Sequence, residues 1–250
     1  MPLHESIGLL AAIATAFMLA GFVKGVIGLG LPTVAIGLLG LLMTPAQAAA
    51  ILLLPSLVTN VWQATHGGGF GVLLRRLGPM LIGICIGTFI GAALLPSGNS
   101  GEATTWLGVA LALYALLGLF NVHFSVPPRA EFWAGPIAGV LTGAITVSTG
   151  VFAIPGVPYV QSLHLDRDKL VQALGLSFTT STIALAAALG HAGTLHADLV
   201  LPSAVALVAV LAGMPLGRIV RGKVKPETFR LWFFAGLLLL GLHLALRTLL

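Results

Sequence analysis

Charge is scarce in this sequence: of its 250 residues, 8% are Asp, Glu, Lys or Arg, whereas 58% are hydrophobic. A soluble globular protein carries about 25% charged residues. So few charges cannot cover a surface that faces water, which makes the lipid bilayer the expected solvent. We therefore predict an all-α polytopic membrane protein, built from apolar runs long enough to cross a membrane.

Cysteine and recognisable catalytic motifs are also scarce or missing. The single cysteine, Cys85, excludes an internal disulfide and a multi-cysteine metal site. The sequence contains no Walker-type Gly-rich loop, no H-E-x-x-H motif and no G-x-S-x-G elbow. Its seven acidic residues all fall near the ends of apolar runs. We therefore expect no bound ATP, no metal, no cofactor and no enzymatic activity.

The charges that are present are mostly basic, and the formal net charge is +5. These basic residues lie in short segments between apolar runs. That pattern orients membrane proteins, so we expect no nucleic-acid partner. The first six residues contain no Lys or Arg and make a poor start for a signal peptide, so we expect the first segment to be retained.

Several apolar runs approach the length of about 20 residues that a spanning helix needs. They are Ala46–Thr65, Leu77–Leu95, Thr104–Phe120, Asp168–Leu189, Asp198–Val220 and Thr228–Leu246. Two longer blocks do not fit one span each. Ser6–Met43 is interrupted at Gly21–Pro32, and Glu131–Leu165 is interrupted between Thr149 and Pro158. Each block is predicted to form a helix, a break, and a second helix or half-helix.

Three pairs of segments recur in the same order in the two halves of the chain. The segment G-F-V-K-G-V-I-G from Gly21 aligns with G-P-I-A-G-V-L-T from Gly135. Residues 57–60 align with 179–182, and residues 87–94 align with 213–220. We predict a duplication, with a first membrane repeat over residues 1–124 and a second over residues 125–250, which together form one transporter domain.

The basic residues distinguish two topologies. If each broken block crosses the membrane once, the basic residues divide between the two faces. If each block enters and returns, as two spans or as a re-entrant hairpin, one face receives only Arg247. The other face then receives Arg75, Arg76, Arg129, Arg167, Lys169, Arg218, Arg221, Lys223, Lys225 and Arg230. The positive-inside rule favours the second scheme, which puts both termini in the periplasm and inverts the two repeats.

Each inverted repeat then holds a broken helix or re-entrant hairpin plus three spanning helices, about 8 to 10 membrane segments in all, an architecture typical of secondary transporters. A broken helix exposes backbone N–H groups, which bind an anion without any side chain. Glycines let a substrate approach the backbone. Gly25, Gly28 and Gly30 at the first break and Gly150 at the second are therefore candidate substrate-binding residues.

Polar side chains near the breaks are the other candidates. Lys24 is the only charge in the first block. It would lie at a cytoplasmic turn if that block forms two full spans. It would lie near mid-membrane, where charge is usually functional, if the block is re-entrant. The remaining candidates are Thr59, Asn60, Gln63, Thr146, Ser148, Thr149, Thr180 and Ser181. For these side chains, hydrogen bonding between helices is the alternative to contact with a substrate.

The doubled Gly-rich segment, followed by a Pro-containing strip and a Ser/Thr-rich helix, resembles the TauE/SafE family of sulfite-exporter-like permeases. The resemblance covers almost the whole chain and is most specific at Gly21–Pro32 and Gly135–Pro155. The first copy reads G28-L-G-L-P32, where the family usually has a fuller glycine run. The resemblance implies a bacterial multi-pass inner-membrane protein linked to sulfite, organosulfonates and other small anions.

We therefore expect a secondary transporter that moves a small anion, such as sulfite or an organosulfonate, across the cell inner membrane by alternating access at the broken helices. A channel-like pore for a small anion or neutral solute has the same architecture and is the alternative. The expected partners are the anionic substrate and the lipid bilayer, and a homo-oligomer is left open.

Overall fold

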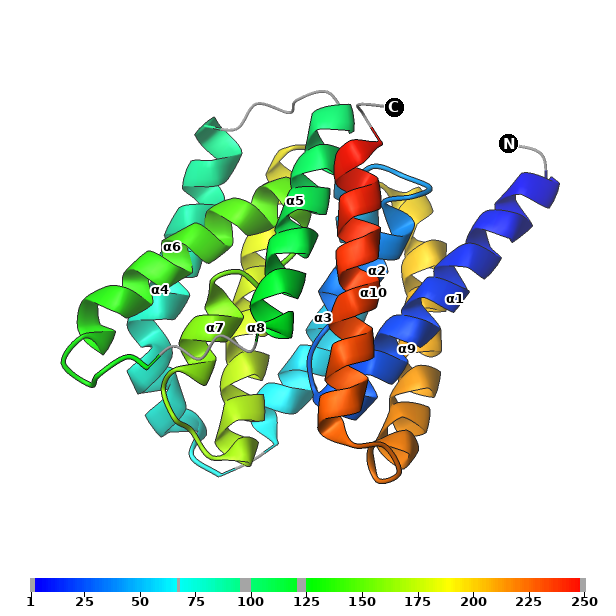
Figure 1. Cartoon of the computed structure of the whole chain (residues 1–250). Helices are drawn as coiled ribbons and strands as arrows, with labels where there is room; N and C mark the ends of the chain where they lie inside the picture. The colour runs from blue at the N-terminus through cyan, green and yellow to red at the C-terminus, as the bar shows by residue number, and fades with distance from the viewer. Residues whose placement is uncertain (1–2, 67, 95–99, 121–124, 248–250) are drawn as a thin grey trace.

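The computed structural model describes residues 3–66, 68–94, 100–120 and 125–247, and all regular structure in that part of the chain is helical (Figure 1). The helices are α1 (Leu3–Ile27), α2 (Leu31–Leu39), α3 (Pro45–Thr65), α4 (Phe70–Leu94), α5 (Ser100–Leu119), α6 (Glu131–Thr149), α7 (Gly156–Gln161), α8 (Arg167–His191), the 3-10 turn η1 (Ala197–Leu199), α9 (Val200–Arg221) and α10 (Pro226–Leu246). The predicted all-α class is confirmed.

Within the described residues, 8 helices are long and apolar enough to cross a membrane. They are α1, α3, α4, α5, α6, α8, α9 and α10, so the chain is a polytopic membrane protein, as its composition predicted. By contrast, α2 has 9 residues and α7 has 6. At about 1.5 Å per residue, neither covers half of a hydrocarbon core about 30 Å thick. Each broken block is therefore one long helix followed by a half-helix.

The first break is shorter than the sequence indicated. α1 continues through Gly21 and Gly25 and ends at Ile27. Gly28 and Gly30 follow with φ of 81° and 98°, a left-handed backbone that glycine adopts without strain. α2 then begins with Pro32 in its first turn. The second break runs from Gly150 to the start of α7, close to its predicted place.

Gly21 and Gly25 serve the contact between α1 and α9. A Cβ atom on Gly21 would lie 2.6 Å from the carbonyl oxygen of Val210 in α9, and Gly213 and Gly217 of α9 lie against α1 in the same way. Two small-xxx-small motifs therefore face each other. These glycines permit the close approach of α1 and α9 and do not interrupt α1. The sequence prediction counted them as part of the break, so the predicted break was too long.

α4 and α6 also pack closely through small-xxx-small glycine motifs. Gly83 and Gly87 of α4 lie against α6, whereas Gly139 and Gly143 of α6 lie against α4. A Cβ atom on Gly83 would lie 2.5 Å from the carbonyl oxygen of Pro136. The α1–α9 and α4–α6 pairs are both parallel, and each joins a helix before residue 124 to a helix after it.

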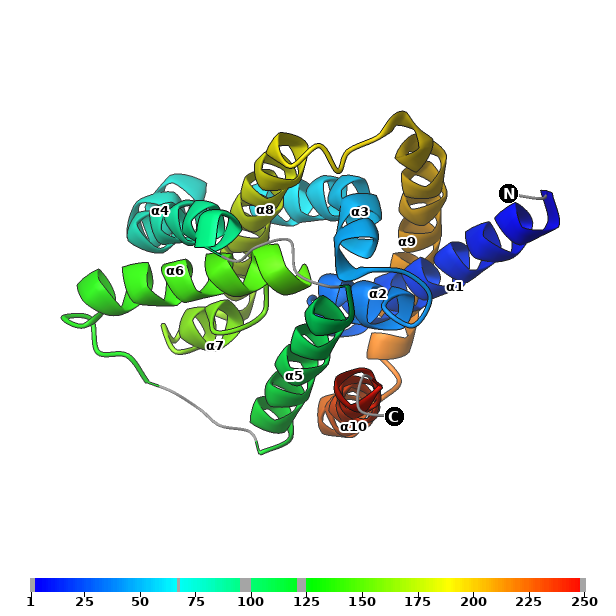
Figure 2. The same ribbon diagram turned by 90° about the horizontal axis from the view of Figure 1, so that it is seen from above.

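The remaining helices are arranged around these two pairs. Seen from above, α3 and α8 lie between the α4–α6 pair and the α1–α9 pair, and α5 packs beside α10 (Figure 2). α3 and α8 are antiparallel, because Ser56 contacts Thr182 while Ala64 contacts Gln172. In Figure 1, α1 begins and α10 ends at the upper edge, and the α3–α4, α7–α8 and α9–α10 connections lie at the lower edge.

α4 begins at Phe70 rather than at the expected Leu77, so Arg75 and Arg76 lie in its first two turns and not in a loop. Arg76 forms a two-point ion pair with Glu131 of α6, with Nε to Oε2 at 2.8 Å and Nη2 to Oε1 at 2.6 Å. Its Nη2 also donates to the carbonyl oxygen of Leu163 at 3.3 Å. This arginine therefore ties the starts of α4 and α6 to the α7–α8 connection.

Candidate functional site

Lys24 lies in the last turn of α1 and is only 3% exposed. Its Nζ donates a hydrogen bond to Thr59 Oγ1 at 2.9 Å and another to Asn60 Oδ1, both on α3. This burial decides against an exposed cytoplasmic turn, which was one of the two positions that the sequence left open. Both acceptors are neutral oxygens, whereas an ammonium group has three donors and a full positive charge.

A chain of hydrogen bonds continues from Asn60 to α8. Asn60 Nδ2 donates to Ser56 Oγ at 2.8 Å, and Ser56 Oγ lies 3.2 Å from Thr182 Oγ1. Thr182 Oγ1 in turn donates to the carbonyl oxygen of Phe178 at 2.7 Å. Asn60, Ser56 and Thr182 are all buried. The chain therefore connects Lys24 of α1 through α3 to α8.

Gln63 connects α3 to the first break. Its Nε2 donates to the carbonyl oxygen of Gly28 at 2.8 Å. Its Oε1 is buried and has no hydrogen-bond partner among the described residues. A buried acceptor left without a donor costs about 1 to 3 kcal/mol. The amide oxygen of Gln63 is therefore a place where a water or a protonated ligand would be stabilised.

The start of α2 lies close to the last turn of α1. A Cβ atom on Gly30 would lie 3.0 Å from Cγ1 of Val23, the neighbour of Lys24. The carbonyl oxygen of Gly30 accepts from Val34 N at 3.0 Å and from Thr33 Oγ1 at 2.9 Å. The first-turn N–H groups of Leu31 and Thr33 have no acceptor within the helix, and the helix start has no side-chain cap. The positive end of the α2 dipole therefore lies near the last turn of α1, the turn that contains Lys24.

The candidates beside the second break form a separate group. Thr146 Oγ1 donates to the carbonyl oxygen of Thr142 at 2.6 Å, and Ser148 Oγ donates to that of Ala144 at 3.1 Å. Thr149 Oγ1 donates to the carbonyl oxygen of Ile145 at 2.7 Å. Two of these hydroxyls also bond to Val151 in the break: Thr146 Oγ1 donates to its carbonyl oxygen at 3.3 Å, and Val151 N donates to Thr149 Oγ1 at 3.2 Å. None of these bonds reaches the Lys24 network.

Gly150 and the two candidates on α8 occupy other surroundings. A Cβ atom on Gly150 would meet Ile36 of α2 and Ala49 of α3. Thr180 is half-buried, whereas Ser181 is 1% exposed and its Oγ has no hydrogen-bond partner among the described residues. Ser181 precedes Thr182, which closes the hydrogen-bond chain from Lys24, so it lies next to the network without joining it.

The sequence placed Thr59, Asn60 and Gln63 on one side of a helix and offered Lys24 as a separate candidate, without predicting that Lys24 contacts them. It also missed two buried residues. Ser56 lies four residues before Asn60, so helical spacing places both on one face, and this signal was available. Thr33 bonds to the backbone at the start of α2. Nothing in the sequence distinguishes the Thr33 hydroxyl from that of a threonine that only packs against a neighbouring helix.

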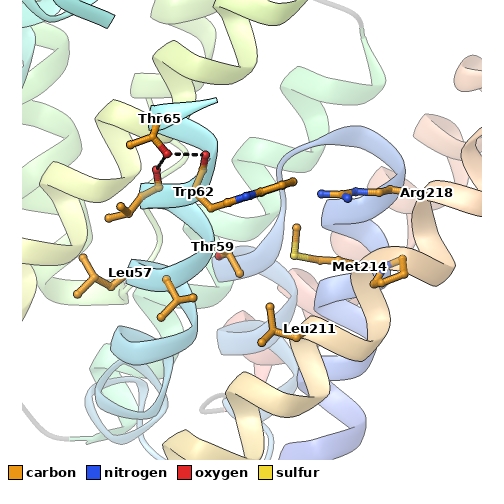
Figure 3. A pocket seen from close by; sticks show the side chains of 10 residues that line it. Leu57, Thr59, Trp62, Thr65, Leu211, Met214 and Arg218 are labelled. Carbon is orange, nitrogen blue, oxygen red and sulfur yellow. Dashed lines mark hydrogen bonds between the residues drawn. The ribbon is translucent and has the colours of Figure 1, made fainter. Parts of the chain in front are cut away.

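A cavity of about 680 Å³ lies beside the contact between α3 and α9 and borders this network (Figure 3). It is lined by Leu57, Val58, Thr59, Val61, Trp62, Thr65, Leu211, Met214, Pro215 and Arg218. Thr59, which accepts a hydrogen bond from Lys24, belongs to its wall. The guanidinium carbon of Arg218 lies 4.6 Å from the centre of the Trp62 ring.

Comparison with known proteins places this chain in a family. The family model described as sulfite exporter TauE/SafE matches residues 13–244, from the first turns of α1 into α10, and so includes both breaks and the Lys24 network. No curated protein and no solved structure gives a significant match. The family match covers most of the chain and agrees with its eight apolar helices of spanning length. The chain therefore belongs to the sulfite exporter TauE/SafE family of membrane transporters.

Proposed function

We propose that the protein is a secondary transporter that carries a small anion, such as sulfite or an organosulfonate, through a site formed by Lys24, Gln63 and the α1–α2 break. One observation carries this proposal: Lys24 is 3% exposed, and its hydrogen-bond partners Thr59 and Asn60 are neutral. A buried charge without a counter-ion is strongly unfavourable. A bound anion would supply the missing charge.

The residues around Lys24 divide into groups that hold it and groups that would meet the anion. Thr59 and Asn60 orient the ammonium group, and Gly25 beside it lets α1 approach α9 closely. The third ammonium donor and the first-turn N–H groups of α2 would face the anion, since both carry positive charge. A protonated oxyanion would also satisfy the buried Oε1 of Gln63.

We further propose that residues 1–124 and 125–250 are two inverted repeats. The order of long helix, half-helix and three long helices occurs twice along the chain. Glycines at equivalent places take part in equivalent contacts: Gly25 of α1 packs on Met214 of α9, and Gly139 of α6 packs on Met80 of α4. In Figure 1, α1 runs from the upper to the lower edge, whereas α6 runs upward.

Alternating access is supported by a difference between two pairs that this symmetry relates. α4 packs directly on α8, whereas the equivalent helices α9 and α3 make a smaller contact and have the cavity beside it. Two repeats of one architecture therefore hold different packings in one structure, as expected for one end state of a transporter whose other state exchanges them. In this proposal, Thr146, Ser148, Thr149, Gly150, Thr180 and Ser181 contact the substrate on the second half of its path.

The proposed location is the cell inner membrane with both termini in the periplasm. The support is the unequal distribution of basic residues between the two edges. The starts of α4, α6, α8 and α10 and the end of α9 lie at the lower edge in Figure 1, and these segments contain Arg76, Lys169 and Arg218. The lower edge is then cytoplasmic under the positive-inside rule.

The test is counterflow of radiolabelled anion into proteoliposomes loaded with unlabelled anion, across sulfite, sulfate, sulfoacetate, taurine and a carboxylate. We expect saturable counterflow for at least one anion, and a loss of at least tenfold in Lys24→Met. Lys223→Met removes the same charge from an exposed position and should keep the wild-type rate. Flux without counterflow would favour the channel-like pore, and a normal rate in Lys24→Met would refute the proposed site.

A further inference from the structure

The cavity between α3 and α9 is a groove that runs along the two helices. Leu57 and Leu211 line one end, and Trp62 and Arg218 line the other. Leu211 and Arg218 are seven positions apart, which corresponds to about 10 Å along a helix axis. Arg218 lies in the last turn of α9, so this end of the groove is at the lower, basic edge of the molecule.

The wall of the groove is apolar and open to the surroundings of the helices. Leu57, Val58, Val61 and Leu211 are 37%, 39%, 41% and 49% exposed. In a helix that crosses a membrane, exposed side chains of this kind face lipid. An ordinary lipid-facing surface is convex, whereas here Met214 and Thr59 form the floor of a recess of about 680 Å³. A recess of this size and lining fits a hydrocarbon chain better than it fits water.

The basic end of the groove supplies a complementary charge. The Arg218 guanidinium group stacks on Trp62 at 4.6 Å, and Figure 3 shows the two side chains facing each other across the gap. Arg218 takes part in no ion pair among the described residues. A planar guanidinium group matches the oxygens of a phosphate, and tryptophan prefers the level of the lipid headgroups. The groove therefore has a cation where a headgroup would lie and an apolar wall where an acyl chain would lie.

We propose that this groove is a binding site for an anionic phospholipid of the leaflet at the basic edge. Its phosphodiester would bind Arg218 beside Trp62, and one acyl chain would lie along Val61, Leu57 and Leu211. The proposal does not depend on which anion the protein transports. It does place the lipid against Thr59, so the lipid would fill the recess that α3 and α9 line.

The site can be tested through the fluorescence of Trp62. The chain has 4 tryptophans, and replacing Trp106, Trp133 and Trp232 by Phe leaves Trp62 as the only emitter. The protein is placed in phosphatidylcholine vesicles that contain increasing fractions of dibrominated phosphatidylglycerol or, in parallel, of dibrominated phosphatidylcholine. We expect the brominated anionic lipid to quench Trp62 with about a fivefold preference, the size expected for one basic residue near an anionic lipid.

Three variants locate the preference. Arg218→Gln should abolish it, and Arg218→Lys should keep much of it because the charge remains. Arg221→Gln, one turn from the groove and outside its lining, should leave it unchanged. Equal quenching by the two lipids in the parent protein would overturn the proposal, as would an undiminished preference in Arg218→Gln. Displacement of the brominated lipid by soluble hexanesulfonate at the concentration that saturates transport would instead assign the groove to the substrate.

Discussion

Replacing Asn60 by Asp puts a permanent counter-ion beside Lys24 without changing the shape of the side chain. Asn60 Oδ1 already accepts a hydrogen bond from Lys24 Nζ, so a carboxylate oxygen would occupy the same place. The buried ammonium group would then be neutralised by the protein itself. We predict that the Asn60→Asp protein folds normally and has lost most of its affinity for the transported anion.

The size of the loss follows from the geometry. A carboxylate at position 60 would lie within a few ångströms of any anion that contacts Lys24, because both would bond to the same nitrogen. Two unit charges about 4 Å apart interact by about 4 kcal/mol at an effective dielectric constant near 20. Each 1.4 kcal/mol changes an equilibrium constant about tenfold, so affinity should fall roughly a thousandfold.

The assay is isothermal titration of the purified protein with the anion that gives counterflow. Gln47→Glu is the matched control, since it makes the same amide-to-carboxylate change in the same helix at an exposed position. Glutamate there also preserves the capping box with Thr44, so α3 should be unaffected. If Asn60→Asp binds within about threefold of the wild type while Gln47→Glu does the same, the anion does not meet Lys24 and the reasoning fails.

Three further predictions concern the fold. Gly139→Leu should lower the midpoint of thermal unfolding, measured by size exclusion, because a side chain there meets the backbone of Met80 and overpacking costs about 1 to 3 kcal/mol or more. The control Gly236→Leu has free space for its side chain and should leave the midpoint unchanged. Equal midpoints for the two variants would refute the α4–α6 contact. A double-mutant cycle of Arg76→Gln and Glu131→Gln should give a coupling free energy of about 1 kcal/mol in thermal unfolding, because this ion pair is partly exposed but makes two hydrogen bonds. A coupling free energy of zero would show that the ion pair does not stabilise the fold. In a Cys85→Ser background, a membrane-impermeant maleimide added to intact cells should label Gly193→Cys and miss Gly222→Cys, and the reverse result would invert the orientation.

The number and order of the spanning helices could be predicted because hydropathy acts over whole segments. A run of about 20 apolar residues has few alternatives to a spanning helix. The helix ends were less predictable. Arg75 and Arg76 were assigned to a connection before the predicted span, yet α4 begins at Phe70 and contains both. Arginines at the edge of a membrane extend toward the headgroups, so a helix can continue past the apolar run.

The glycines were the main source of error at the break, because one residue type has two uses. Gly28 and Gly30 permit a left-handed backbone, whereas Gly21 and Gly25 permit contact with α9. The local sequence does not distinguish these uses, since the second depends on a helix about 190 residues further along the chain. The hydrogen-bond partners of Lys24 could not be predicted for the same reason, because the burial of Lys24 depends on how α3 packs against the end of α1.

The central claim is that the transported anion binds at Lys24, and the most direct measurement is to locate it. Selenite is a pyramidal oxyanion like sulfite, and its selenium gives an anomalous X-ray signal. Crystals of the wild-type protein grown with selenite should show an anomalous peak beside the α1–α2 break, with an oxygen about 2.8 Å from Lys24 Nζ. The peak should disappear in Lys24→Met. Peaks only at the exposed basic residues of the lower edge, with the Lys24 site empty at saturating selenite, would contradict the claim.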